Sequence, residues 1–460
     1  MSEASRFKRP RESDETGNEG DANMKNLNNL PDHVLVDIIS RLKMKEAIRT
    51  SVLSKRWEYL WTSKSDFEFK EGCNDKRYFK SIVDGALASH NSSSINEFRL
   101  SCKVRRDGSH IKTWVCAAVK RNVHLVHITL NSGLVLPSCL LTCATLTSLC
   151  LNLRSTLSVP TSVCLSALKF LDLACVKFSV DNSIQKLLSG CPVLEKLEFC
   201  ECNWTKLSSL SISAPMLQSL EIIEYTFFGF GSNPSNIDGC QVAIFGTNNL
   251  KSFTYCGALE NEYCIYNSPA IENVHLDVAY NGGRGNFFAH KAYKLMNGLA
   301  NAEKLILIDE IMKILSDAEE LLPYIPMFQR LAHLQLEIRS VNLDCKPLLK
   351  LLRCSHYLKT LDFNEGISLL SDFSKNDDLM NPVPHCLLNE VKSITIEKFS
   401  GNEKALQAVE LLLKNALVLE NMTITCIANS GRLHRKVTKL SKRFPKGSES
   451  CKVIVYSDVY

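Results

Sequence analysis

An apolar pattern, apolar-x-x-apolar-x-apolar, recurs along most of the chain and limits its fold more than any other feature. Thirteen copies occur between Ile95 and Ile424, with a mean spacing of 27 residues. The last two apolar positions of each copy are two residues apart, which is the period of a β-strand with alternate side chains on one face. The copies begin at Ile95, Leu125, Leu146, Leu168, Leu194, Leu217, Leu250, Ile271, Ala302, Leu331, Leu358, Val391 and Leu419.

The repetition predicts stacked units with one continuous core, because a single short strand cannot bury its apolar face alone. The mean spacing lies within the range of about 20–29 residues that leucine-rich repeats show. Individual steps run from 21 to 33 residues, which indicates an irregular array. We therefore expect an α/β fold: an irregular leucine-rich-repeat solenoid with parallel strands on its concave side and helices or irregular crossings on its convex side.

The residue between the last two apolar positions of each copy should face the concave surface, since strand side chains alternate. Charged or polar residues hold this position in several copies: Asp172, Glu198, Glu221, His275, Gln335 and Asp362. Three of them are carboxylates in successive or nearby copies. We therefore take Asp172, Glu198 and Glu221 as candidate target-binding residues that favour a basic segment of a partner.

A helical pattern precedes the repeats. Apolar residues recur there at spacings of three and four, which places them on one stripe of a helix; they are Leu30, Val34, Leu35, Ile38, Ile39 and Leu42. Pro31 and Asp32 suit the start of that helix, where a missing N–H is harmless and a negative charge favours the helix dipole. A second short helix is expected near Ala47 to Val52, followed by Trp57 and Trp61.

The last eighty residues have a different pattern. We expect strands at Val391 to Ile396, Met422 to Ile424 and Lys452 to Tyr456, with helices at Glu403 to Leu413 and Leu433 to Phe444. Seven Lys and Arg residues and no acidic residue lie between Arg432 and Lys446. A solvated helix face explains this basic run better than nucleic-acid contact, because the net charge of the whole chain is only +5.

Two segments resemble the F-box: Leu30-Pro31-Asp32-His33-Val34-Leu35 and Arg49-Thr50-Ser51-Val52-Leu53-Ser54-Lys55-Arg56-Trp57. Near the other end, the segment from Val383-Pro384-x-Cys386-Leu387 and the ending Ser450-Cys451-Lys452-Val453-Ile454-Val455 resemble the FBD domain. The whole chain is similar to the plant family that combines an F-box, leucine-rich repeats and an FBD domain. On this resemblance the expected domains are an F-box at 25–70, the solenoid at 71–380 and an α/β FBD cap at 381–460.

The resemblance implies a binding role and no catalytic residues. Proteins of this family dock on a Skp-family adaptor, which joins them to cullin and RING subunits of an SCF-type ubiquitin ligase, and they hold a target for degradation. By the same resemblance, nine residues make or support the adaptor-facing surface, although several of them can also pack within the module: Leu30, Pro31, Leu35, Ile38, Ile39, Leu42, Ile48, Val52 and Trp57. Two alternatives stay open. One is a repeat protein that binds the adaptor without directing ubiquitination, and the other is a nucleic-acid-associated protein.

Other sequence features indicate which part of the chain is ordered and where in the cell it is expected. Residues 1–24 are too polar to offset the entropy of ordering, so we expect a disordered tail. Within it, Lys8-Arg9-Pro10-Arg11 fits either a nuclear-import signal or a solvated basic patch. No secretory signal is visible, so we expect a nuclear or cytoplasmic protein whose nineteen cysteines are reduced.

We expect the protein to use no cofactor. No cysteine or histidine set has the spacing of a zinc site, and neither a phosphate loop nor a nucleophile elbow is present. The uncharged stretch from Ser132 to Leu153 contains Pro137 and several Ser and Thr residues, and its leucines follow the repeat. We therefore assign it to the core of the solenoid and expect no membrane span.

Overall fold

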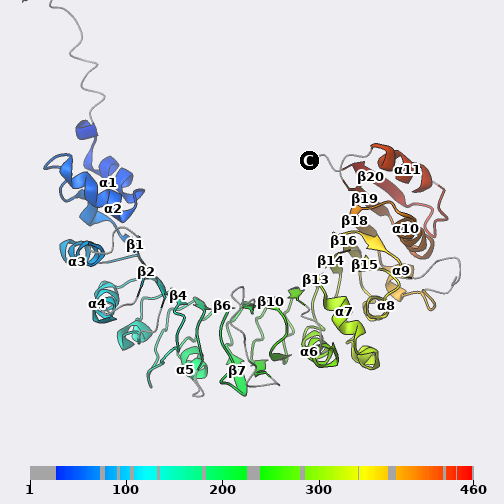
Figure 1. The fold of residues 1–460 in the computed structure, drawn as a ribbon, viewed down its shortest axis with the longest axis horizontal. Coiled ribbons are helices and arrows are strands. Elements are labelled where there is room, and N and C mark those ends of the chain that lie inside the picture. The colour runs from blue at the N-terminus through cyan, green and yellow to red at the C-terminus, as the bar shows by residue number, and fades with distance from the viewer. Residues whose placement is uncertain are drawn as a thin grey trace, which may run out of the picture.

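The computed structural model describes residues 27–72, 78–90, 94–103, 108–131, 135–178, 183–224, 239–279, 285–339, 341–370, 380–427, 431–441 and 443–457. The chain forms an open arc, with a helical module at its N-terminal end and an α/β cap at its C-terminal end (Figure 1). Strands line the inner side of the arc and most helices lie along its outer side. The predicted disordered tail and the segment Lys8 to Arg11 lie outside the described residues.

The N-terminal module contains two short helices, α1 (Asp32–Ser40) and α2 (Met44–Arg49), and the 3₁₀ turns η1 (Leu27–Asn29), η2 (Thr50–Val52) and η3 (Leu60–Ser63). Its core is small and consists of Leu35, Ile39, Met44, Ala47, Trp57 and Trp61. Both α2 and the first strand of the solenoid contribute to one continuous apolar core. The module therefore closes the end of the solenoid, where a free first unit would expose its apolar face.

One parallel sheet of fifteen strands runs through the whole arc. Its strands, in spatial order, are β1 (Asp66–Lys70), β2 (Glu97–Cys102), β3 (Leu125–Leu130), β4 (Ser148–Asn152), β5 (Phe170–Ala174), β6 (Lys196–Cys200), β8 (Ser219–Ile223), β10 (Ser252–Gly257), β12 (Asn273–Val278), β13 (Lys304–Asp309), β14 (His333–Glu337), β16 (Thr360–Phe363), β18 (Ser393–Phe399), β19 (Asn421–Cys426) and β20 (Lys452–Ser457). This arrangement confirms the expected α/β fold.

Twelve of the thirteen sequence copies lie in the expected register, and the second copy is displaced by two residues. The pairing of Phe98 with Val126 makes Val123, Val126 and Ile128 the core positions of that unit. Leu125, which we expected in the core, is half-buried on the concave side. The strand alternates Leu, Val, Ile and Leu closely enough that the pattern fits in two phases, and the neighbouring strand decides between them.

Helices cover the convex side at both ends of the arc. They are α3 (Phe79–Ser89), α4 (Gly108–Val119), η4 (Ser138–Thr142), α5 (Ser183–Ser189), α6 (Gly285–Gly298), α7 (Ile311–Ser316), η5 (Glu319–Tyr324) and α8 (Lys346–Arg353). In the middle, a second parallel sheet covers the convex side, made of β7 (Ser209–Ser213), β9 (Gln241–Phe245) and β11 (Glu262–Ile265). A short ladder of β15 (Val341–Asn342) and β17 (Ile367–Ser368) lies farther along.

The C-terminal cap continues the same sheet through β18, β19 and β20, with α9 (His385–Asn389), α10 (Glu403–Asn415) and α11 (Gly431–Ser441) on its outer side. The side chain of Asn402 caps α10 by accepting a hydrogen bond from the Ala405 N–H at 2.8 Å. Residues 371–379, which precede the expected boundary at 381, lie outside the described residues. The boundaries at 25, 71 and 381 therefore stay predictions.

None of the described helices is both long enough and apolar enough to span a membrane. Among the described residues, His, Cys, Asp and Glu side chains form no group of three that could hold a metal ion.

Candidate functional site

The concave surface is built from aligned rows of side chains, because every strand pair in the main sheet is parallel. We define the central row as the concave residue between the two core residues of each strand. Adjacent members of this row are about 4.8 Å apart along the sheet. The row consists of Glu68, Arg99, His127, Cys150, Asp172, Glu198, Glu221, Thr254, His275, Ile306, Gln335, Asp362, Thr395, Thr423 and Ile454.

The three predicted target-binding carboxylates are consecutive members of the central row. Asp172 on β5 pairs with Glu198 on β6, and Glu198 pairs with Glu221 on β8. We call these three residues the acidic ladder. Their side chains are half-buried, and one cation lies close to them, since the Lys196 Nζ is 2.5 Å from a Glu198 carboxylate oxygen.

The acidic ladder carries more negative charge than its surroundings neutralise. Burial raises the pKa of Asp172 to about 6, with further contributions from the neighbouring charges of Glu198 and Glu221. Burial also raises the pKa of the adjacent Cys150 to about 11, with Asp172 the next cause. A positively charged ligand would relieve this repulsion, so the ladder suits a Lys or Arg side chain of a partner.

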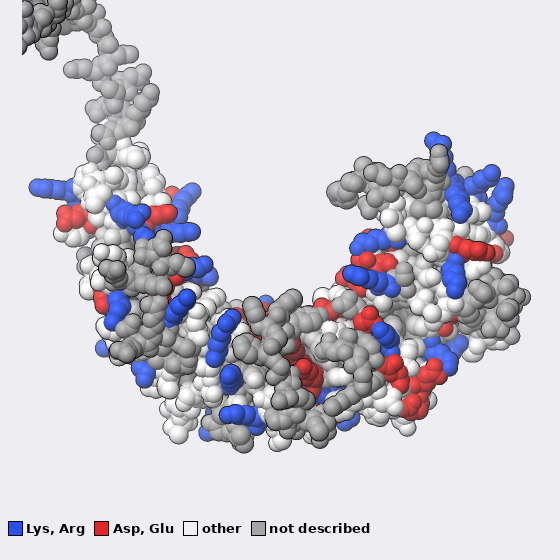
Figure 2. Space-filling model, viewed as in Figure 1, with Lys and Arg blue, Asp and Glu red and all other residues white. Residues whose placement is uncertain are grey.

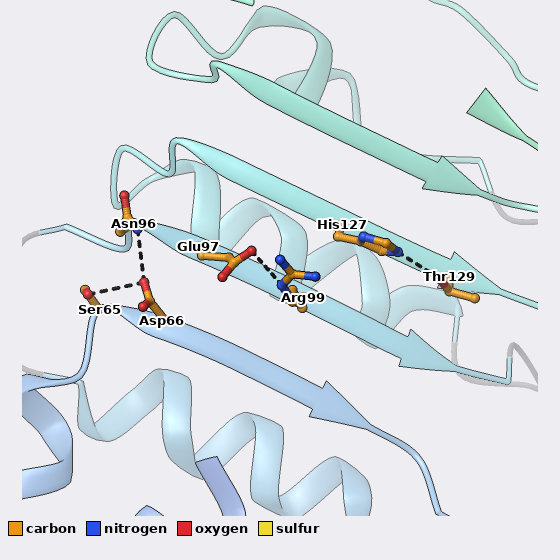
Figure 3. Close-up of polar contacts among 7 residues, drawn as sticks. All are labelled: Ser65, Asp66, Asn96, Glu97, Arg99, His127 and Thr129. Carbon is orange, nitrogen blue, oxygen red and sulfur yellow. Dashed lines mark hydrogen bonds and ion pairs between the residues drawn. The ribbon is translucent and has the colours of Figure 1, made fainter. Parts of the chain in front are cut away.

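The N-terminal part of the concave surface has a different electrostatic character (Figure 3). Arg99 on β2 donates to Glu97 on the same strand at 2.6 Å, so these two charges neutralise each other. Asn96 donates to Asp66 at 3.1 Å, and His127 is hydrogen-bonded to Thr129 at 3.3 Å. Burial and the positive charge of Arg99 lower the pKa of His127. This end of the concave surface is therefore polar but largely balanced in charge.

The nine predicted adaptor residues of the N-terminal module fall into three groups. Leu35, Ile39 and Trp57 are buried inside the module. Leu30, Ile38, Leu42 and Ile48 are half-buried against its core. Pro31 and Val52 are exposed, and Val52 is 85% exposed.

Sequence reasoning missed two exposed apolar residues that follow Val52 in the chain. Leu53 is 59% exposed and Tyr59 is 64% exposed. The 3₁₀ turn η2 ends at Val52 and turns both Val52 and Leu53 toward solvent. A helical pattern gives no signal for such a turn, since its period differs from 3.6 residues. We refer to Val52, Leu53 and Tyr59 as the exposed apolar group of the module.

Comparison with known proteins identifies both parts of the chain. Residues 27–69 match the F-box domain model, and residues 86–453 match the model described as the At1g61320/AtMIF1 LRR domain. The chain belongs to this leucine-rich-repeat family and carries an F-box. The match extends over most of the fifteen-stranded sheet and confirms the resemblance and the fold class expected from sequence.

Relatives from Arabidopsis thaliana cover nearly the whole F-box/leucine-rich-repeat chain. The F-box/FBD/LRR-repeat protein At5g56420 is 26% identical over 93% of this chain and 98% of its own length. The FBD-associated F-box protein At4g10400 is 29% identical over 87% of this chain and 92% of its own length. The F-box/LRR-repeat protein At3g62440 is 25% identical over 94% of this chain and all of its own length.

One arginine holds the two segments of the F-box together. The Nε and Nη2 atoms of Arg56 donate to a carboxylate oxygen of Asp32 at 2.8 and 2.6 Å, and Nη2 also donates to the Leu30 carbonyl at 2.6 Å. These bonds fix the start of α1 against the chain that follows η2. The exposed apolar group is thereby held in a defined position relative to Pro31.

The basic run near the C-terminus forms α11 and the residues after it. Arg435, Lys436, Lys439, Arg443 and Lys446 are exposed there. Lys442 lies outside the described residues. Figure 2 shows Lys and Arg side chains gathered over this end of the arc, away from the concave floor. Val437 is buried against the cap, so α11 has one apolar side and one cationic side.

Proposed function

We propose that this chain is the substrate-recognition subunit of an SCF-type ubiquitin ligase. The F-box binds a Skp-family adaptor, and through it cullin and RING subunits, while the concave surface of the repeats binds a target protein. The observation that carries this proposal is the exposed apolar group, and above all the 85% exposure of Val52, in a module that matches the F-box model. A module of about 40 residues buries little by itself, and a partner that covers such side chains would stabilise it.

The nine residues that the family resemblance assigns to the adaptor surface have different roles in this proposal. Pro31 and Val52 are free to contact a partner, together with the newly recognised Leu53 and Tyr59. Leu30, Ile38, Leu42 and Ile48 can extend this surface from its edge. Leu35, Ile39 and Trp57 act from inside, because they hold the two helices in place.

The target surface is the concave side, and the acidic ladder is its most distinctive feature. Asp172, Glu198 and Glu221 are adjacent, half-buried and only partly neutralised. We propose that they bind Lys or Arg side chains of the target. Carboxylates with this excess of negative charge attract a cationic segment over a distance limited by the Debye length of about 8 Å at physiological salt.

The chain contributes binding and geometry to the reaction, and the ubiquitin-charged enzyme contributes the chemistry. Holding a target beside that enzyme converts an encounter in solution into one at high effective concentration. The proposed location is the nucleus or the cytoplasm, where the other subunits of such a ligase would have to be present.

The adaptor step is tested by titrating a purified Skp-family adaptor into the full chain. Burying one valine side chain contributes about 1.5 kcal/mol, so Val52→Asp should raise the Kd at least about tenfold. Val135→Asp is the matched control, because Val135 is also an exposed valine, at 56%, but lies in the solenoid. The Leu30→Ala/Pro31→Ala pair should weaken binding in the same direction.

An unchanged Kd for both F-box variants would overturn the receptor proposal. If the adaptor binds but no cullin co-purifies, and if no protein accumulates when the proteasome is inhibited, the chain is an adaptor-binding repeat protein outside a ligase.

The target step is tested by proximity labelling with the full chain and with an F-box deletion that prevents loss of targets. Reversing the ladder charges with Asp172→Lys, Glu198→Lys and Glu221→Lys should remove partners rich in basic segments. The control variant Glu337→Lys/Asp362→Lys changes two acidic residues farther along the same concave surface. An identical labelling profile for the wild type and the ladder variant would refute the proposal that the acidic ladder binds the target.

A further inference from the structure

Two thiols on the convex side are in direct contact. The Sγ atoms of Cys116 and Cys139 are 3.2 Å apart. Cys116 lies on α4 and Cys139 lies on η4, the covering segments of two successive units. Both residues are half-buried, so a small oxidant can reach them from solvent.

Several other cysteine sulfurs contact oxygen atoms. Cys191, Cys354 and Cys386 are buried and donate to backbone carbonyls of Leu187, Ile325 and Leu352 at 3.2 to 3.8 Å. Such cysteines act as small core residues. All eighteen described cysteines are free, and the sulfur atoms of Cys116 and Cys139 contact each other.

We propose that Cys116 and Cys139 form a modification site at which hydrogen peroxide or a small hydroperoxide makes a reversible disulfide. A disulfide requires the two sulfur atoms to approach to about 2.05 Å, so the pair must close by roughly 1 Å from its present contact. The proposal requires rotation of the two side chains to supply this movement.

The reaction balances with one peroxide. The Cys116 thiol ionises and its thiolate attacks one oxygen of hydrogen peroxide. The O–O bond breaks, and the released hydroxide takes up the thiol proton, so that a sulfenic acid and one water form. The Cys139 sulfur then attacks Cys116 Sγ, the S–S bond forms, the S–O bond breaks, and hydroxide leaves as water with the proton from Cys139. Two thiols and one peroxide thus give one disulfide and two waters, and a cellular dithiol or glutathione reverses the step.

The order of the two sulfurs follows from their environment. The pKa of Cys139 is raised to about 11, first by burial and then by its contact with Cys116. The thiolate is the reactive form of cysteine. Cys139 therefore suits the second step, in which a sulfur already in contact with it accelerates the attack.

The bond would join neighbouring units without touching either binding surface. The loop it closes, from residue 116 to residue 139, contains β3 of the main sheet. Oxidation therefore ties together the units next to the F-box, while the concave side stays open. Within a reducing compartment such a bond is expected to be transient and responsive to oxidants.

Peptide mapping of the full chain tests the proposal. The reduced protein is treated with an equimolar amount of hydrogen peroxide, free thiols are blocked, and the chain is digested with trypsin without reductant. The expected product joins peptide 113–120, which contains Cys116, to peptide 122–154, which contains Cys139, Cys143 and Cys150. Dithiothreitol should release the two peptides.

Serine variants identify the sulfur involved. Cys139→Ser should abolish the linked product, whereas Cys143→Ser, a neighbouring buried thiol, should leave it unchanged. Cys116→Ser provides a second loss-of-linkage variant if Cys139→Ser fails to fold. The proposal is overturned if the link persists in Cys139→Ser, or if wild-type Cys116 is converted to sulfinic acid or a glutathione adduct with no linked peptide.

Discussion

Replacing Asp172 by asparagine should stabilise the centre of the solenoid at neutral pH and leave it unchanged in acid. In the folded chain the Asp172 carboxylate is half-buried, and it lies next to Glu198 and near Glu221 in the acidic ladder. Burial and these neighbouring charges raise its pKa from 3.8 to about 6. Asparagine has nearly the same shape and no charge, so it removes the repulsion and keeps the packing.

The magnitude follows from the two pKa values. A difference between 3.8 and about 6 corresponds to a ceiling of about 3 kcal/mol. Solvent screens a half-buried carboxylate, and we therefore expect a gain of about 1 kcal/mol. Well below pH 3.8 the carboxyl group is protonated in both the folded and the unfolded chain, so the penalty is absent. As the pH rises through about 6 the folded group ionises and stability falls.

Hydrogen exchange followed by mass spectrometry measures this effect locally. A gain of about 1 kcal/mol should slow amide exchange in peptides from β5, β6 and β8 about fivefold at pH 7.5. At pH 3 the ratio between variant and wild type should be close to one. Asp362→Asn is the control, because Asp362 lies in the same central row between Gln335 and Thr395, which carry no charge. Equal slowing at both pH values, or equal slowing in the control, would refute the electrostatic explanation.

Three further predictions concern other parts of the chain. Leu35→Ala should destabilise the F-box by about 3 kcal/mol, since it empties a fully buried site, and limited proteolysis of the N-terminal module should detect this as faster cleavage. Glu224→Gln should lower the melting temperature of the chain, because Tyr255 and Tyr263 donate to the two oxygens of the Glu224 carboxyl group at 2.5 Å and an amide would leave one of these donors without an acceptor, at a cost of about 2 kcal/mol; an unchanged melting curve would show that the network adds nothing. Arg435→Glu should leave the salt concentration at which the chain elutes from immobilised DNA unchanged, as a solvated helix face requires, and earlier elution would favour the nucleic-acid alternative.

Much of the main sheet could be predicted from sequence because each repeat fixes its own register. Two of the three apolar positions are the strand residues that point inward, and twelve of the thirteen copies pair as the pattern requires. The first strand, β1, was not predicted by the pattern, although its residues Phe67 and Phe69 are buried like the apolar residues of the other strands. Lys64 holds the position where every other copy has an apolar residue. Its Nζ donates to the Ser40 carbonyl, so the F-box fills the place of a preceding repeat.

The convex side was less predictable. Its segments cover the core in several equally effective ways, so their type is set by local sequence and by neighbouring units. The outer strands β7, β9 and β11 show this, since each has two buried apolar residues with one residue between them, such as Leu210 and Ile212. Such short alternations are too weak to distinguish a strand from an irregular crossing until three of them pair.

Folding constrains the residues of the central row less than it constrains the residues of the core. Its side chains point away from the packed interior, so folding requires a strand-compatible residue there and little more. At the ladder, three carboxylates are kept side by side although they repel one another and one of them titrates near pH 6. An uncharged residue in place of Asp172 would give a more stable solenoid. Folding does not require these carboxylates, and their mutual repulsion is unfavourable. A ligand that removes the repulsion is the best explanation for them, and a bound Lys or Arg side chain would remove it directly.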